Sequence, residues 1–339
     1  MTSLTFALIA GVVTFALSLA LPVVVKPILV RLGIMDVPND RSSHIKPVLR
    51  GLGLAVLIAM AIGYLVALVA PGGMIEYDSA ALALSLVAGA AICSGLLGLG
   101  EDLKGVSVTV RSVLLLAIAL GVGLGLVWYG GAAWWLVIYA VLFVSGYINV
   151  ANFMDGLNGI SGFHGVIAGL AFAATGVLAD IVWLVPAGLI LAAGFGGFLP
   201  WNLTKPGAFL GDVGSYLLGG ATAATSLFAL VSGAPILATI GPMIIYFGDV
   251  AVTLVKRVRA GHKWDEPHKE HVYQRLNQLG LSHVQASGIT ALFSLAGALL
   301  GLASFFVAPI WWLLLLAGGL ALVVIYVAMP RLLEKSRAR

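Results

Sequence analysis

The sequence has few charged residues and almost no cysteine. Of its 339 residues only 9% are Asp, Glu, Lys or Arg, whereas 61% are hydrophobic, and the mean hydropathy is +1.09. Soluble domains carry roughly 25% charged residues, so this chain could not cover a water-facing surface. The single cysteine, Cys93, excludes an internal disulfide framework. The sequence therefore indicates an integral membrane protein.

Long apolar runs divide the chain into membrane-spanning segments. A helix needs about 20 mostly apolar residues to cross the hydrocarbon core of a bilayer. The first run lacks a basic start, so we expect a span there rather than a cleaved signal peptide. We predict an all-α polytopic membrane protein of about eleven transmembrane helices that form one domain, residues 1–339. The predicted spans are 4–25, 51–70, 80–100, 111–129, 133–149, 160–179, 181–199, 214–232, 234–255, 286–307 and 309–329.

The basic residues indicate how the chain is oriented. With eleven spans, all 18 Lys and Arg fall on one side of the membrane, and basic loops stay in the cytoplasm. We therefore expect a periplasmic amino terminus and a cytoplasmic carboxyl terminus. This topology also accounts for the net charge of +4, so we expect a lipid bilayer and no nucleic acid as partner. The predicted cytoplasmic loops are about 26–50, 101–110, 150–159, 200–213 and 256–285.

Two of these loops contain groups suited to bind phosphate and metal ions. The segment from Asp36 to Gly53 combines cations, hydroxyls and a histidine, and its Arg side chains could hold phosphate oxygens. A plain topology-setting loop is the alternative. Glu101 and Asp102 are adjacent carboxylates next to hydrocarbon, which is costly unless they are paired or bind a metal. Oxygen ligands suit Mg²⁺ or Mn²⁺, and a solvated helix end is the alternative.

The next two loops interrupt apolar stretches with dense polar groups. Between Asn149 and Ser161, four Asn and Asp side chains alternate with Gly, which lets a ligand approach the backbone. An Asn-Gly turn is the alternative. Between Pro200 and Ser215, a helix start offers free N–H groups to phosphate, and Asp212 could hold a cation that bridges phosphates. Simple capping of the helix is the alternative there.

The last loop carries two histidines at helical spacing. His268 and His271 share one face if the segment is helical, and they could bind metal, contact phosphate or handle a proton. A surface pair is the alternative, and two His do not complete a zinc site. Asp249 lies inside a predicted span, where acids are candidates for function. Together the loops suggest phosphoryl transfer between a soluble phosphate donor and a lipid acceptor.

In these five segments, which cover roughly residues 36–283, the chain resembles the polyprenyl-phosphate N-acetylhexosamine-1-phosphate transferases of glycosyltransferase family 4. That group includes phospho-N-acetylmuramoyl-pentapeptide translocases and the enzymes that initiate O-antigen, enterobacterial common antigen and teichoic acid synthesis. The segment His268-Lys-Glu-His271-Val-Tyr-Gln is most similar to the branch that starts O-antigen chains.

The resemblance implies a reaction, a cofactor and partners. Sugar 1-phosphate would pass from a UDP-N-acetyl sugar to undecaprenyl phosphate, with release of UMP, at the cytoplasmic face of the bacterial inner membrane. The lipid phosphate would attack the β-phosphorus directly. Mg²⁺ would be the cofactor, with Mn²⁺ as a second candidate. A homodimer is also an expectation, because family members are often dimers.

The resemblance also assigns roles to individual residues. Asp212 would match the metal-binding Asp of Gly-Asp-x-Gly-Ser. The catalytic candidates are Glu101, Asp102, Asp155, His268 and His271. The substrate-binding candidates are Arg41, Ser42, His44, Arg50, Asn152, Asn158 and Lys205.

Three positions depart from the family pattern. Glu101 and Asn158 stand where members commonly have Asp, and Leu52 interrupts a Gly-rich turn. These changes keep a catalytically inactive homologue open as an alternative. A secondary transporter is another, but it predicts paired halves and polar groups near the midplane, whereas the polar groups here lie at span ends.

Overall fold

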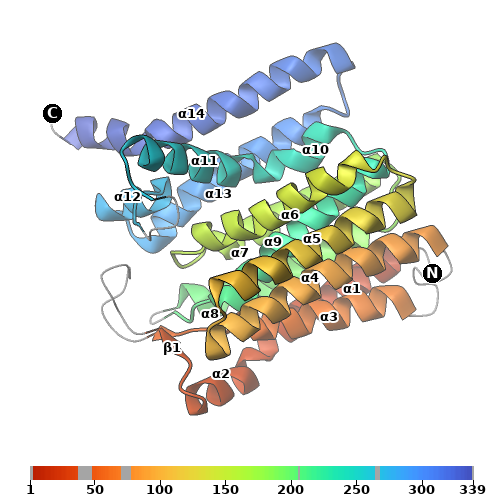
Figure 1. The fold of residues 1–339 in the computed structure, drawn as a ribbon, viewed down its shortest axis with the longest axis horizontal. Coiled ribbons are helices and arrows are strands. Elements are labelled where there is room, and N and C mark those ends of the chain that lie inside the picture. The colour runs from red at the N-terminus through yellow and green to blue at the C-terminus, as the bar shows by residue number, and fades with distance from the viewer. Residues whose placement is uncertain (1–2, 37–47, 70–77, 205–206, 264–267, 338–339) are drawn as a thin grey trace.

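Helices form nearly all of the computed structural model, which describes residues 3–36, 48–69, 78–204, 207–263 and 268–337 (Figure 1). The first half comprises α1 (Ser3–Ala20), α2 (Pro22–Arg31), α3 (Gly53–Val69), α4 (Asp78–Lys104), α5 (Val108–Gly130), α6 (Trp135–Met154) and α7 (Ile160–Leu178). The second half comprises α8 (Leu184–Leu203), α9 (Gly211–Val231), α10 (Ile236–Ile240), η2 (Gly241–Met243), α11 (Ile244–Arg259), α12 (Val272–Gln278), α13 (His283–Ala303), η3 (Pro309–Trp311) and α14 (Trp312–Arg337).

The polytopic helical architecture is confirmed. Among the described residues, nine helical segments are long and apolar enough to cross a membrane, and the pair α1–α2, bent by 41°, makes a tenth. The remaining predicted span is α3, an apolar helix of 17 residues. Each predicted span therefore coincides with a helix or with consecutive helices. The first and last helices begin and end at opposite ends of the bundle (Figure 1), as an odd number of crossings requires.

The structure differs from the prediction at the segment ends. The described chain is not purely helical, because β1 (Met35–Asp36) and β2 (Val48–Leu49) form a short antiparallel pair. Helices α4 and α6 also continue past the predicted spans, so Glu101, Asp102 and Asn152 lie on helices rather than in loops. Hydropathy falls where polar residues begin, whereas backbone hydrogen bonding continues for another turn.

Helix α9 forms the centre of the bundle and positions the polar groups described below. It packs against α4, α6 and α3, and nearly all of its residues are buried. Small residues allow this close packing. A Cβ on Gly98 of α4 would come within 2.1 Å of the Asp212 carbonyl oxygen, so the two backbones are in direct contact. The carboxyl-terminal end of α4 and the start of α9 are therefore held beside each other.

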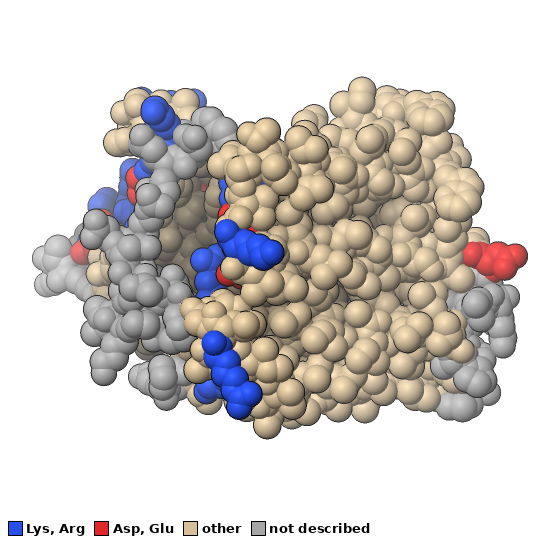
Figure 2. Space-filling view, turned by 60° about the horizontal axis from the view of Figure 1, so that its bottom comes forward, with Lys and Arg blue, Asp and Glu red and all other residues tan. Residues whose placement is uncertain are grey.

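The Lys and Arg side chains seen in Figure 2 gather at one end of the molecule, which we call the basic end, whereas an acidic side chain lies at the opposite end. The basic end is the end where α4 finishes, α9 starts and α12 lies. Figure 2 shows Lys, Arg, Asp and Glu around a hollow there, next to a broad surface without charge. Exposed apolar side chains also lie on α5, α6 and α14, for example Val113, Leu142 and Leu313. Such a surface suits lipid contact.

Candidate active site

Asp102, in the last turn of α4, connects three parts of the chain. Its Oδ1 accepts a hydrogen bond from the Asp212 N–H at 3.0 Å, and its Oδ2 accepts one from the Val213 N–H at 2.9 Å. These amides belong to the first turn of α9. N–H groups there lack helical partners, and the helix dipole has its positive end there. The Arg50 Nε lies 2.8 Å from the same Oδ1. With its side chain only 1% exposed, Asp102 is fully engaged in holding α4, α9 and Arg50 together.

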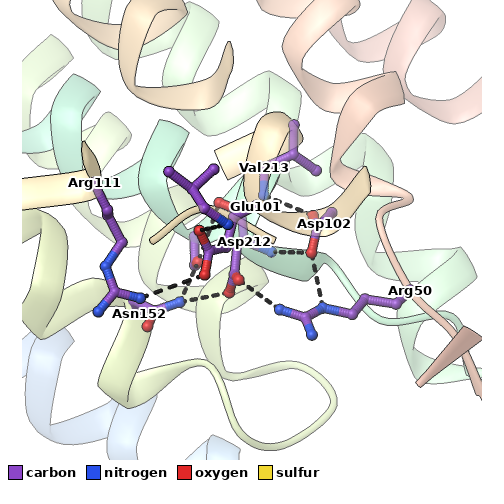
Figure 3. A network of polar contacts seen from close by, with 9 residues as sticks. Arg50, Glu101, Asp102, Arg111, Asn152, Asp212 and Val213 are labelled. Carbon is purple, nitrogen blue, oxygen red and sulfur yellow. Dashed lines mark hydrogen bonds and ion pairs between the residues drawn. The ribbon is translucent and has the colours of Figure 1, made fainter. Parts of the chain in front are cut away.

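Asp212 carries the carboxylate at the centre of the cluster (Figure 3). Its Oδ2 accepts a hydrogen bond from the Arg50 guanidinium at 2.5 Å, and its Oδ1 accepts one from Asn152 Nδ2 at 2.8 Å. Asn152 also donates to the Ser215 hydroxyl at 3.0 Å. Arg50 therefore bridges Asp102 and Asp212. The Asp212 side chain remains 17% exposed, so its carboxylate is accessible from the basic end.

Asp155 lies directly after α6 and faces the same cluster. Its Oδ1 accepts a hydrogen bond from the Ser161 hydroxyl at 2.6 Å. Burial raises the pKa of this carboxyl to about 7, and repulsion from Asp212 and Asp102 acts in the same direction, against the Ser161 hydrogen bond and the charge of Arg50. A carboxyl with a pKa near neutrality is suited to accept and release a proton.

Glu101 has a separate set of partners. Its Oε2 accepts a hydrogen bond from the Val106 N–H at 3.0 Å, and its Oε1 lies 3.5 Å from Arg111 Nη1. Figure 3 shows Arg111 and Glu101 beside Asn152 and Asp212. Glu101 therefore fixes the α4–α5 turn and holds Arg111 next to the cluster.

The histidine segment lies against the end of α6. The Tyr273 hydroxyl donates to the Phe153 carbonyl at 2.9 Å, and the rings of His271 and Phe153 are stacked with centroids 6.3 Å apart. The His268 ring lies 4.8 Å from that of His271. Burial, the neighbouring His271 and Arg257 lower the pKa of His268 to about 4. His271 therefore lies against the Asn152–Asp155 segment, with His268 beside it.

Five segments far apart in sequence come near one another at this site, and comparisons with known proteins identify the family of the chain. Residues 83–230 match glycosyl transferase family 4. The decaprenyl-phosphate N-acetylglucosaminephosphotransferase of Mycolicibacterium smegmatis is 30% identical over 77% of this chain and 73% of its own length. The chain belongs to glycosyl transferase family 4.

Two further relatives of this transferase family extend the comparison. The probable undecaprenyl-phosphate N-acetylglucosaminyl 1-phosphate transferase of Bacillus subtilis is 27% identical over 81% of this chain and 78% of its own length. The phospho-N-acetylmuramoyl-pentapeptide-transferase of Desulforudis audaxviator is 35% identical over 32% of this chain. The family match includes Asp102, Asp155 and Asp212, whereas Arg50 and the histidine segment lie outside it.

Asn158, a predicted substrate-binding residue, lies apart from the Asp212 cluster. Asn158 donates from Nδ2 to the Asn202 carbonyl at 2.7 Å, and its Oδ1 lies 3.4 Å from His283 Nδ1. Its amide therefore joins the turn before α7 to α8 and α13, and no described hydrogen bond links it to Asp212. Four predicted binding residues lie outside the described residues, and these are Arg41, Ser42, His44 and Lys205.

The structure adds residues that the sequence did not assign to the site. Arg111 appears in the sequence only as one loop cation, yet it pairs with Glu101. Ser161 and Ser215 stand inside polar segments of the sequence, and their hydroxyls contact Asp155 and Asn152. Position inside a dense polar segment was the available signal for both serines, whereas nothing in the sequence distinguished Arg111 from other cations.

The donor set at the site can be compared with the needs of a divalent cation. The described residues contain no group of three His, Cys, Asp or Glu side chains placed to hold a metal. Mg²⁺ is commonly bound by one or two carboxylates, with waters and substrate phosphates completing the octahedron. Asp212, partly exposed and close to Asp155, offers this kind of oxygen-only set.

Proposed function

We propose that this chain transfers N-acetylhexosamine 1-phosphate from a UDP-sugar to undecaprenyl phosphate, which yields the lipid-linked diphosphate sugar and UMP. The observation that carries the proposal is Arg50 bridging Asp102 and Asp212 at the basic end of a membrane bundle. The family membership and the names of the relatives, which specify polyprenyl phosphate and N-acetylglucosamine, support it.

The proposed step is an in-line displacement at the β-phosphorus of the donor. A phosphate oxygen of the lipid forms the new P–O bond, and the bond from the β-phosphorus to the oxygen shared with the α-phosphate breaks. UMP leaves with that oxygen. Arg50 and Arg111 supply positive charge next to the cluster, where phosphate oxygens gather negative charge.

The geometry favours different tasks for the three acids. Both oxygens of Asp102 already accept backbone or guanidinium hydrogens, so we assign it to positioning Asp212 and Arg50. Asp155, with its raised pKa, is the group best suited to take a proton from the acceptor phosphate. Asp212 is the proposed metal ligand. Mg²⁺, or Mn²⁺ in its place, would neutralise charge on the donor diphosphate when bound.

The histidine segment and the membrane orientation complete the proposal. His268 and His271 would contact phosphate beside Asn152 and Asp155. We place the basic end on the cytoplasmic face, because the Lys and Arg residues gather there. A lipid-linked sugar made at that face would begin an O-antigen or another cell-envelope polysaccharide.

The decisive experiment measures UMP release by the purified full chain. UDP-N-acetylglucosamine and UDP-N-acetylgalactosamine are each supplied with undecaprenyl phosphate, in Mg²⁺, in Mn²⁺ or in EDTA. We expect UMP only with donor, lipid acceptor and divalent cation together. A protein that moves substrate across vesicles without forming UMP would be a transporter, and one that does neither would be an inactive homologue.

The metal assignment has its own test. Asp212→Asn should fold and lose transfer by at least about 100-fold, because charge stabilisation in the transition state is lost. Full Mg²⁺-dependent transfer by a folded Asp212→Asn protein would overturn the role given to Asp212.

A further inference from the structure

A second polar cavity lies at the basic end, between α11, α12 and α14. Its volume is about 160 Å³. None of the cluster residues Arg50, Asp102, Asn152, Asp155 and Asp212 lines it. The lining residues are Thr253, Lys256, Glu270, Val272, Arg275 and Val327.

Positive charge at this cavity is only partly neutralised. Lys256 and Arg275 line the cavity, and Arg331 on α14 repels the Lys256 ammonium together with Arg275. Arg275 has one weak partner, Glu334, at 3.6 Å. Among the described residues, no carboxylate lies within ion-pair distance of Lys256 or Arg331. Neighbouring cations repel one another, so the arrangement is favourable when an anion lies between them.

The helices that carry these cations also expose apolar side chains. Val255 and Val258 flank Lys256 on α11 and are 49% and 57% exposed. Val324 and Leu332 on α14 are 68% and 54% exposed. Both helices belong to segments long and apolar enough to cross a membrane. The cavity is therefore lined by helices that carry cations at one end and also expose apolar side chains, as lipid-contacting helices do.

We propose that this cavity binds the headgroup phosphate of an anionic phospholipid, of the phosphatidylglycerol type, with the acyl chains along α11 and α14. Basic pockets between transmembrane helices attract anionic headgroups, and each Lys or Arg near the surface contributes about 1 kcal/mol. Lys256, Arg275 and Arg331 donate to the phosphate oxygens. Glu270 and Val272, which line the cavity, flank His271, so the bound lipid also holds the segment that carries this histidine.

Native mass spectrometry of the delipidated full chain in detergent tests the proposal without any donor sugar, so its outcome is separate from the transfer assay. The protein is titrated with dioleoyl phosphatidylglycerol and with dioleoyl phosphatidylcholine. We expect one saturable binding site for phosphatidylglycerol and weaker binding of phosphatidylcholine. The double variant Lys256→Gln/Arg331→Gln should bind phosphatidylglycerol about 30-fold more weakly, since about 1 kcal/mol per cation is about fivefold.

A matched control removes the same charge from the same helices. Arg259 and Lys335 neither line the cavity nor act on the charge of Lys256, whereas Lys256 lines it and Arg331 repels Lys256. Arg259→Gln/Lys335→Gln should therefore weaken the first bound lipid less than about threefold, as rim charges do. Glu334→Gln removes the carboxylate beside Arg275 and should strengthen binding. Glu334 is half exposed, so Glu334→Gln should fold normally. It therefore tests the proposal even if Lys256→Gln/Arg331→Gln does not fold.

Three results would overturn the proposal. Equal weakening by both double variants would show general surface attraction, and equal binding of the two phospholipids would show no charge selectivity. In a third arm, undecaprenyl phosphate replaces phosphatidylglycerol. Loss of undecaprenyl phosphate binding alone in Lys256→Gln/Arg331→Gln would assign the cavity to the acceptor lipid.

Discussion

The carboxylate of Asp249 holds the imidazole of His271, with Oδ1 3.0 Å from Nδ1, and both side chains are buried. Asp249 also accepts the Val272 N–H at 3.0 Å, at the start of α12. Hydroxyls of Thr253 and Tyr326 donate to the same carboxylate at 3.1 and 3.3 Å. One acid in α11 therefore orients the histidine and fixes the start of the helix that follows it. A carboxylate only accepts, so Nδ1 carries the hydrogen of this bond, which fixes the orientation of the ring.

Replacement of this acid should impair catalysis more than folding. Asp249→Asn keeps the shape but can present an amide N–H to Nδ1, which disturbs the ring orientation and tautomer. We expect transfer to fall by about 10- to 100-fold, the usual effect of losing a group that orients a functional histidine. UMP release as a function of pH is the measurement, because a change in tautomer alters the pH profile as well as the rate.

Tyr326→Phe provides the control for Asp249. It removes one hydroxyl from the same carboxylate and leaves the contact with His271 intact. The lost hydrogen bond is long, at 3.3 Å, and the bond from His271 to Asp249 stays in place, so the rate should change by less than about fivefold and the pH profile should not change. Equal effects of both variants would contradict an orienting role for Asp249.

The sequence predicted the membrane architecture well, because lipid demands long apolar helices whatever their neighbours. It placed their ends less well. Asp102 and Asn152 were predicted in loops but lie on α4 and α6, since polar residues at a span end remain helical. The face of the membrane on which the basic end lies stays a prediction from charge.

The site was predicted in its residue types more than in its contacts. The candidates Asp102, Asp155 and Asp212 lie near one another in the structure. Arg50 bridges Asp102 and Asp212, and both of these acids repel the carboxylate of Asp155. The bond from Asp102 to the start of α9 joins residues 110 positions apart, and no local pattern specifies such a pair. The partner of His271 was equally hidden, because Asp249 stands out in sequence only as an acid inside a span.

The adjacent acids Glu101 and Asp102 should respond differently to neutralisation. Asp102→Asn removes the carboxylate that accepts from Arg50 and from the first turn of α9, and losing a hydrogen bond to a charged group costs about 1.5 to 3 kcal/mol. Glu101→Gln disrupts a longer, partly exposed contact with Arg111, which contributes up to about 1 kcal/mol. Thermal unfolding in detergent, alongside UMP release, checks the order. A larger loss for Glu101→Gln would refute it.

The raised pKa of Asp155 should make stability depend on pH in one direction. Its pKa is about 7 in the folded protein and 3.8 in the absence of shifts. Between these values Asp155 keeps its proton in the folded state and has lost it in the unfolded chain. The contribution of Asp155 to the free energy of unfolding therefore falls as pH rises from about 4 to 7, and it is constant above pH 7. Each unit corresponds to roughly 1.4 kcal/mol.

Asp155→Asn should remove this contribution. The unfolding temperature of the variant, relative to that of the parent, should therefore rise as pH rises. Thermal unfolding in EDTA between pH 4.5 and 8 measures the difference. Ser161→Ala is a useful companion, because it removes a hydrogen bond that lowers the pKa and should extend the falling region to higher pH. Parallel curves for the parent and Asp155→Asn would rule out a titrating Asp155.

The contact of α4 with α9 offers a test of how packing supports the site. A methyl group on Gly98 would come within 2.1 Å of the Asp212 carbonyl oxygen and 2.4 Å of its carbon, so the helices must separate. Overpacking typically costs about 1 to 3 kcal/mol, and here it also draws Asp102 away from the amides of Asp212 and Val213. Gly98→Ala should therefore lower both the unfolding midpoint and UMP release.

Gly89, two and a half turns earlier on the same helix, is the matched control for Gly98. A methyl group there meets nothing within 4 Å, and Ala is favoured over Gly in a helix by about 1 kcal/mol. Gly89→Ala should thus leave transfer unchanged and keep or raise the unfolding midpoint. If both variants lost transfer equally, helix rigidity rather than the distance between α4 and α9 would govern the site. If Gly98→Ala alone loses transfer, Asp102 depends on backbone contact between two helices to reach the amides that it holds.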